Sequence, residues 1–104
     1  MVTQNDIIPS IQALKETLAR NKIPISRAIL FGSYAKGLEQ AFSDIDVALV
    51  SEEFSGNRFW DIEKVIPFIR SLNPLFEIHP FRPEDFLDTD NSFIEEIIST
   101  GIEV

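Results

Sequence analysis

The chain contains no cysteine, and this absence excludes several kinds of site. Disulfide bridges, thiol nucleophiles and thiolate metal centres all require that residue. The sequence also lacks a run of about 18 uncharged apolar residues, which a membrane-spanning helix would need. No basic and then apolar leader of the kind that directs secretion is present. We therefore expect a cytoplasmic protein with neither a membrane span nor a signal peptide.

Basic residues are scarce relative to acidic ones. The 104 residues include 9 lysines and arginines against 17 aspartates and glutamates, which gives a formal net charge of −8. A surface of that sign repels phosphate backbones, so direct binding to nucleic acid is disfavoured. The remaining composition, 44% apolar and 25% charged, is typical of a globular protein, and the length predicts a single domain over residues 1–104.

Hydrophobic periodicity predicts a fold of the α/β (α+β) class, with a small mixed sheet covered by helices in the order α-β-α-β-α-β-α. The expected helices cover 6–21, 58–71 and 92–100, with shorter helical turns after Gly32 and near 85; the expected strands cover 28–31, 45–50 and 75–81, the last interrupted by Pro80. The short connection between the first two strands predicts an antiparallel pair. The helix between the second and third strands predicts a parallel pair.

Acidic residues stand at unusual places in two of these strands. Asp44 and Asp46 flank Ile45 at the start of the second strand, and strand alternation places both carboxylates on one face. Glu77 of the third strand is expected on the same face. Carboxylates held close together repel one another, and divalent cations supply the missing counter-charge. Asp44, Asp46 and Glu77 are therefore the candidate catalytic and metal-binding residues, with oxygen ligands that suit two Mg²⁺ or Mn²⁺ ions about 4 Å apart.

The turn after the first strand is suited to bind the phosphate groups of a substrate. Gly32 has no side chain, so its backbone can approach a phosphate, and the hydroxyl of Ser33 can donate to a phosphate oxygen. Lys36 follows three residues later and can add a cation, although a lysine in a solvated loop is an equally good interpretation. An antiparallel strand pair would bring this turn to the edge of the sheet where Asp44 and Asp46 lie.

The arrangement Gly32-Ser33, ten residues, Asp44-Ile45-Asp46 is similar to the signature of the polymerase β-like nucleotidyltransferase superfamily. Within it, the segments FGSYAKG, SDIDVALV, FEIHPF and FIEEIISTGIEV resemble the minimal nucleotidyltransferase (MNT) family over nearly the whole chain. The resemblance implies transfer of a nucleoside monophosphate, usually AMP from ATP, to a hydroxyl with release of pyrophosphate. Several members are antitoxins that silence a helical HEPN ribonuclease toxin by adenylylating one of its tyrosines.

The resemblance also implies roles for particular residues. Asp44 and Asp46 match the metal-binding pair, and Gly32 and Ser33 match the phosphate turn. Glu77 matches a third carboxylate that is more often an aspartate in the family. ATP as substrate, two Mg²⁺ ions as cofactors and a hetero-oligomer with a HEPN toxin follow from the same resemblance.

Two other functions fit the sequence. One is an antitoxin that binds nucleotide without turnover and neutralises its partner by covering it, since larger relatives use a second domain to grip base and acceptor. The other is modification of a small molecule, as in aminoglycoside nucleotidyltransferases. His79 shares the face of Glu77 and admits two interpretations, a ligand or base of the site, or a hydrogen-bonded structural histidine.

Overall fold

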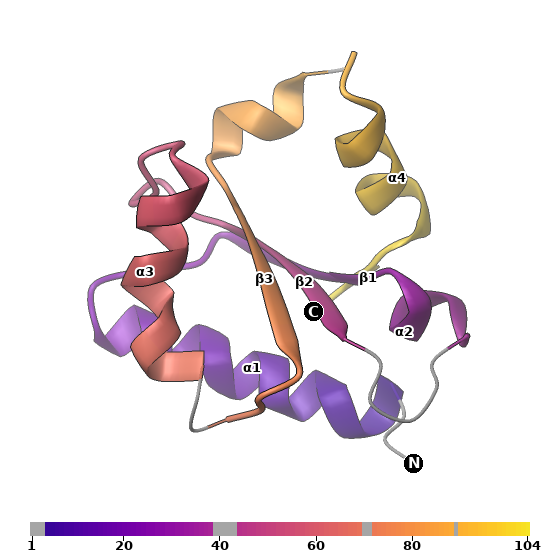
Figure 1. Cartoon of the computed structure of the whole chain (residues 1–104), viewed down its shortest axis with the longest axis horizontal. Helices are drawn as coiled ribbons and strands as arrows, with labels where there is room; N and C mark the ends of the chain where they lie inside the picture. Colours follow the sequence, from indigo (N-terminus) through magenta and orange to yellow (C-terminus); the bar gives the residue numbers. More distant parts are fainter. Residues whose placement is uncertain (1–3, 39–43, 70–71, 89) are drawn as a thin grey trace.

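The structure is a computed structural model that describes residues 4–38, 44–69, 72–88 and 90–104. Four strands form one sheet in the order β3-β2-β1-β4, with helices packed around it (Figure 1). The elements are α1 (Gln4–Arg20), β1 (Arg27–Phe31), α2 (Ser33–Lys36), β2 (Ile45–Val50), α3 (Arg58–Ile69), β3 (Phe76–Phe81), the 3₁₀ helix η1 (Pro83–Leu87), α4 (Ser92–Thr100) and β4 (Ile102–Glu103). The mixed α/β architecture predicted from the sequence is confirmed.

The strand directions are those that the connections predict. β1 pairs with β2 antiparallel and β2 pairs with β3 parallel. The crossover between β2 and β3 contains α3, which is long enough to return the chain to the starting edge of the sheet. β4 is an addition to the predicted strands. It is two residues long, pairs antiparallel with β1, and is too short to show any hydrophobic period.

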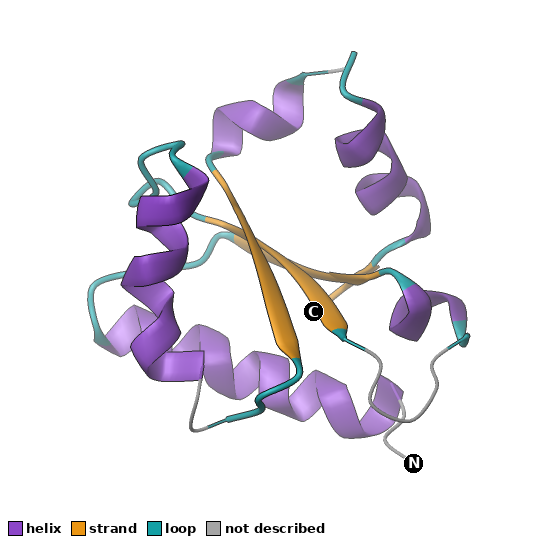
Figure 2. Cartoon of the chain, viewed as in Figure 1, coloured by secondary structure: helices purple, strands orange, loops and turns teal. Residues whose placement is uncertain are grey.

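The two faces of the sheet are covered to different extents (Figure 2). α1 and α3 pack on one face, where Ile45, Val47 and Leu49 of β2 join the main core. α4 and η1 pack on the other face, where a smaller apolar cluster is formed by Ile29, Phe31, Ala48 and Ile97 with Phe81 and Phe86 at its margin. The even-numbered residues of β2 point to this second face, as strand alternation requires.

One local expectation is wrong. Pro80 does not interrupt the third strand, because β3 is an edge strand, where a residue without an N–H can be tolerated on the outer side. At the start of α3, Phe59 and Trp60 are exposed, with exposed fractions of 62% and 63%. Among the described residues, no helix has both the length and the hydropathy needed to cross a membrane.

A buried carboxylate fixes the loop that leads into α3. Asp61 has an exposed fraction of 2%, and its oxygens accept hydrogen bonds from the backbone N–H and hydroxyl of Ser55 at 2.7 and 2.9 Å and from the N–H of Gly56 at 3.0 Å. Three donors satisfy the carboxylate, which offsets the cost of burying it. The loop and the first turn of α3, including Arg58, are therefore held as one unit.

We expect Asp61→Ala to lower the free energy of unfolding by about 3 kcal/mol, because three partly buried donors would lose their acceptor. Urea denaturation followed by circular dichroism measures the change. Glu63→Ala is the matched control, since Glu63 is an exposed acidic residue of the same helix and should shift stability by about 0.5 kcal/mol or less. Equal effects of the two substitutions would show that the Asp61 hydrogen bonds contribute little.

Candidate functional site

The register of the sheet brings two predicted carboxylates side by side. Asp46 of β2 is paired with Glu77 of β3, and on its other side Asp46 is paired with Phe31 of β1. Both acidic residues lie near the amino ends of their strands, whereas α4 and η1 follow the carboxyl end of β3. The side chain of Asp46 is 24% exposed, and Glu77 is exposed. This part of the sheet face is therefore accessible to a substrate.

The turn after β1 lies directly against Asp46. Gly32 has φ 75° and ψ −150°, and a Cβ placed on it would lie 2.5 Å from Asp46 Oδ2. Only glycine commonly adopts that backbone conformation, and only glycine leaves room for the carboxylate. The structure thus confirms the predicted meeting of the turn and the second strand. Tyr34, the single tyrosine of the chain, follows in α2 and is buried, with an exposed fraction of 2%.

The remaining predicted residues lie around this centre. Asp44 directly precedes β2 and is exposed. Ser33 begins α2, and its backbone carbonyl accepts from Leu38 at 2.9 Å. Lys36 forms an ion pair with Glu96 of α4, with Nζ 3.2 Å from Oε1, so its ammonium is directed to α4 in this structure.

His79 completes a hydrogen-bonded cluster that the sequence does not specify. Its Nε2 lies 3.1 Å from Asp46 Oδ1, and its Nδ1 lies 3.3 Å from Nη1 of Arg58, the first residue of α3. The imidazole contacts the rings of Phe31 and Phe93, with centroid distances of 4.9 and 5.8 Å, and those two rings contact each other at 5.7 Å. His79 is therefore hydrogen-bonded through both ring nitrogens, and one of its partners is a predicted site residue. Arg58 is absent from the predicted site, and no pattern in the sequence indicates it.

The cluster has the residue types of a metal centre. One ligand atom from each of Asp46, Glu77 and His79 can be chosen so that all three lie within 4.8 Å of one another. Two carboxylates on neighbouring strands fit Mg²⁺ or Mn²⁺, which bind few protein oxygens and keep open positions for water and phosphate. Among the described residues, Asp44 is not a member of this group, although it lies two residues from Asp46. The donor set fits a divalent ion.

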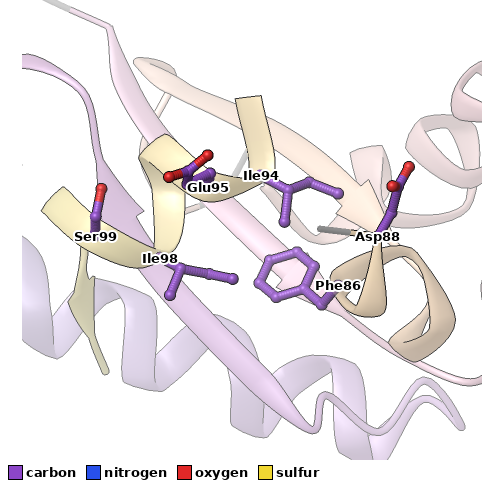
Figure 3. A pocket seen from close by; sticks show the side chains of 6 residues that line it. All are labelled: Phe86, Asp88, Ile94, Glu95, Ile98 and Ser99. Carbon is purple, nitrogen blue, oxygen red and sulfur yellow. The ribbon is translucent and has the colours of Figure 1, made fainter. Parts of the chain in front are cut away.

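A pocket of about 350 Å³ lies between η1 and α4 (Figure 3), and its described lining includes none of the predicted site residues. Its lining includes the apolar side chains of Phe86, Ile94 and Ile98, with Asp88 and Glu95 at its margin. The aliphatic and aromatic groups converge on the space, as Figure 3 shows. This pocket suits an apolar group with basic neighbours better than it suits a triphosphate.

A second hollow, of about 440 Å³, reaches Arg58 from the side of η1 and also contacts Arg82 and Asp85. Burial acts to raise the pKa of the Asp85 carboxyl, but hydrogen bonds from the side chain and backbone of Arg82 outweigh it and hold that pKa below its ordinary value. The Arg82 side chain lies 3.1 Å from Asp85 Oδ1. This ion pair links the residue that precedes η1 to the first turn of that helix, on the wall of a hollow that Arg58 also lines.

Comparison with known proteins places these features in context. The sequence matches the family model described as a nucleotidyltransferase domain over residues 11–99. The fold is similar to that of a candidate nucleotidyltransferase from Sulfolobus solfataricus, with TM-score 0.68, 17% identity, and coverage of 96% of this chain and 80% of that one.

The fold of this chain is also similar to that of a chain from a crystal structure of a toxin-antitoxin with AMP-PNP. The TM-score is 0.57 and the identity is 22%, with coverage of 91% of this chain and 69% of that one. Similarity at these identities establishes a shared fold. None of the curated proteins compared is a significant match.

Proposed function

Because the chain belongs to the nucleotidyltransferase domain family, we propose that it transfers AMP from ATP to a hydroxyl of a partner protein. More specifically, we propose that the acceptor is a tyrosine of a helical HEPN ribonuclease toxin and that this chain is the antitoxin of that toxin. The observation that carries the enzymatic part is the placement of Asp46 beside Glu77 on an accessible part of the sheet, against the Gly32 turn.

The proposed reaction is a displacement at phosphorus. The oxygen of the acceptor hydroxyl forms a bond to the α-phosphorus of ATP, and the bond from that phosphorus to the oxygen bridging to the β-phosphate breaks. Pyrophosphate leaves with the electron pair of the broken bond. The hydroxyl proton passes to a base, for which the Glu77 carboxylate is the candidate, and then to solvent. The products are the adenylylated acceptor and pyrophosphate.

The chain contributes binding and orientation to this reaction. Asp44, Asp46 and Glu77 are the residues that would hold two Mg²⁺ ions, with Mn²⁺ as a substitute. When bound, such ions neutralise charge on the phosphates and on the leaving pyrophosphate. Gly32 and Ser33 are the candidate contacts for the triphosphate. Lys36 would have to leave Glu96 to join them, so its role in phosphate binding depends on an exchange of partners.

Two observations support a protein as the partner. A structural relative of this chain is described as a toxin-antitoxin, and its crystals contained AMP-PNP. On this chain, Leu87 and Ile98 have exposed fractions of 80% and 49% beside the pocket between η1 and α4, where Glu95 adds negative charge. Exposed apolar groups with acidic neighbours are suited to a partner that presents apolar and basic side chains.

The same exposed surface favours a second candidate function. Its residues belong to η1 and α4, and the described lining of the pocket between them includes neither Asp46 nor Glu77. A partner bound there would not need the carboxylates. The domain would then neutralise a toxin by covering it, with nucleotide bound but not turned over.

Radiolabelled ATP tests the proposed reaction directly. The full chain is incubated with Mg²⁺, a co-purified HEPN partner and ATP labelled either at the α-phosphate or at the γ-phosphate. We expect the α label to appear on the partner, to depend on Mg²⁺, and to be released from its phosphodiester linkage to tyrosine by a phosphodiesterase. The γ label should appear only in pyrophosphate. Transfer of the γ label, or no transfer to any protein, would contradict the proposal.

A further inference from the structure

The carboxylate of Asp46 is restricted on two sides. Its Oδ1 is hydrogen-bonded to His79 Nε2 at 3.1 Å, and its Oδ2 is the atom nearest to the space above Gly32. The side chain of His79 is itself only 11% exposed, and Phe31 and Phe93 contact its ring. Rotation of the imidazole is therefore hindered, and its two nitrogens keep distinct partners.

The partner of the second nitrogen determines which nitrogen carries the proton. Arg58 Nη1 lies 3.3 Å from His79 Nδ1, and a guanidinium nitrogen can only donate a hydrogen bond. Nδ1 must then be the acceptor, without a proton. A neutral imidazole in that state carries its proton on Nε2, where it can donate to Asp46 Oδ1. The heavy-atom positions thus favour one tautomer.

This tautomer limits what His79 can do. A histidine nitrogen binds a metal through its lone pair, and in this tautomer Nε2 has a proton in that place. Of Asp46, Glu77 and His79, only the two carboxylates would then bind an ion, and the imidazole would donate a hydrogen bond to Asp46. Hydrogen bonds of this kind orient a ligand, and their loss typically costs about 10- to 100-fold in metal affinity or activity.

We propose that His79 is a positioning residue, held by Arg58 in the Nε2-protonated tautomer, which directs Asp46 Oδ2 toward the Gly32 turn and does not itself bind the metal. The functional reason for that orientation rests on the proposed nucleotidyl transfer. The tautomer of His79 and its dependence on Arg58 are independent of that reaction, so they can be measured without an activity assay.

The composition of the chain makes the tautomer easy to measure. His79 is the single histidine, so a long-range ¹H–¹⁵N spectrum of the untagged, metal-free protein contains one imidazole. We expect the chemical shifts of an Nε2-protonated ring, unchanged in kind when Mg²⁺ is added. Arg58→Met should produce a mixture of tautomers, whereas Arg20→Met, a change at an exposed residue on α1, should leave the spectrum as it is.

Two substitutions of His79 separate positioning from simple packing. His79→Gln places an amide N–H near the position of Nε2 and can still donate to Asp46, whereas His79→Asn reaches only to the position of Nδ1 and cannot. Mn²⁺ binding, measured by calorimetry on the folded variants, should weaken about 10- to 100-fold in His79→Asn and about threefold or less in His79→Gln. A role in packing alone would affect the two variants alike.

Several results would overturn the proposal. An Nδ1-protonated ring in the metal-free protein would contradict the assignment to Arg58. Loss of the Nε2 proton on addition of Mg²⁺ would make His79 a metal ligand. Equal Mn²⁺ affinity of the Asn and Gln variants would remove the positioning role. If the tautomer and the Mn²⁺ affinities are as expected but labelled ATP transfers nothing, the proposed reaction fails and the positioning of Asp46 stands.

Discussion

Asp46→Asn is expected to lower the rate of nucleotidyl transfer by about 10³-fold or more while leaving the fold intact. The substitution removes a charge that would neutralise a bound metal ion, and orientation and charge stabilisation at such a site account for several kcal/mol of barrier lowering. The shape of the side chain is kept. Its amide oxygen can still accept the hydrogen bond from His79, so the packing around the imidazole need not change.

Stability is the second readout of this variant. Asp46 is paired with Glu77 across the sheet, and two carboxylates so placed repel one another when no cation is bound. Without metal, Asp46→Asn should therefore unfold at the same urea concentration as the wild type or at a slightly higher one. Added Mg²⁺ should raise the melting temperature of the wild type and have less effect on the variant.

Asp44→Asn should show a similar loss of transfer, and Glu63→Gln is the control for the removal of one negative charge. Glu63 is an exposed residue of α3, which packs on the opposite face of the sheet. Transfer that is undiminished in both aspartate variants would contradict the roles proposed for them. Protection of cells against the toxin by these inactive variants would instead favour the second candidate function, in which binding alone neutralises the partner.

Gly32→Ala is expected to disrupt both stability and activity, whereas Gly37→Ala should affect stability alone and less. Gly37 has φ 70° and ψ 23°, the left-handed helical region, which costs alanine about 1 kcal/mol, and a Cβ added there would meet nothing within 4 Å. Gly32 combines φ 75° with ψ −150°, a region that only glycine commonly enters. A Cβ at that position would also meet Asp46 Oδ2 at 2.5 Å.

The two alanine variants are compared by urea denaturation and by the labelled-ATP assay. We expect Gly32→Ala to lose about 3 kcal/mol or more of unfolding free energy, and its folded fraction to transfer AMP about 10²-fold more slowly, since displacement of Asp46 by even about 1 Å has effects of that size. Gly37→Ala should keep the wild-type rate. Equal losses in the two variants would show that the space beside Asp46 is not restricted by the turn.

The parts of the fold that were predictable are those with a local cause. Only 13 residues separate Phe31 from Ile45, which is short for a parallel crossover and predicts the antiparallel pair that is observed. Alternation along β2 places Asp46 on the face opposite to that of Ile45 and Val47. Glycine at position 32 marks the turn because of the backbone conformation it permits. These causes act within a few residues and are visible in the sequence.

The rest of the site depends on register and on the start of a helix, which the sequence does not specify. His79 reaches Asp46 only because Ala48 pairs with His79, and a shift of β3 by one residue would turn the imidazole to the other face. Arg58 reaches the same ring because α3 begins at that residue. Strand β4 escapes prediction for a different reason, since its pairing with β1 is a long-range contact of only two residues.

The burial of Tyr34 bears on how any modified product should be interpreted. The chain has one tyrosine, and that phenol lies within the core beside the Gly32 turn rather than on the surface. A domain that adenylylates tyrosine would thus carry no exposed tyrosine of its own and would not modify itself at that residue type. Any adenylylated tyrosine recovered from a mixture of the two proteins would then report on the partner, without the need to separate the chains first.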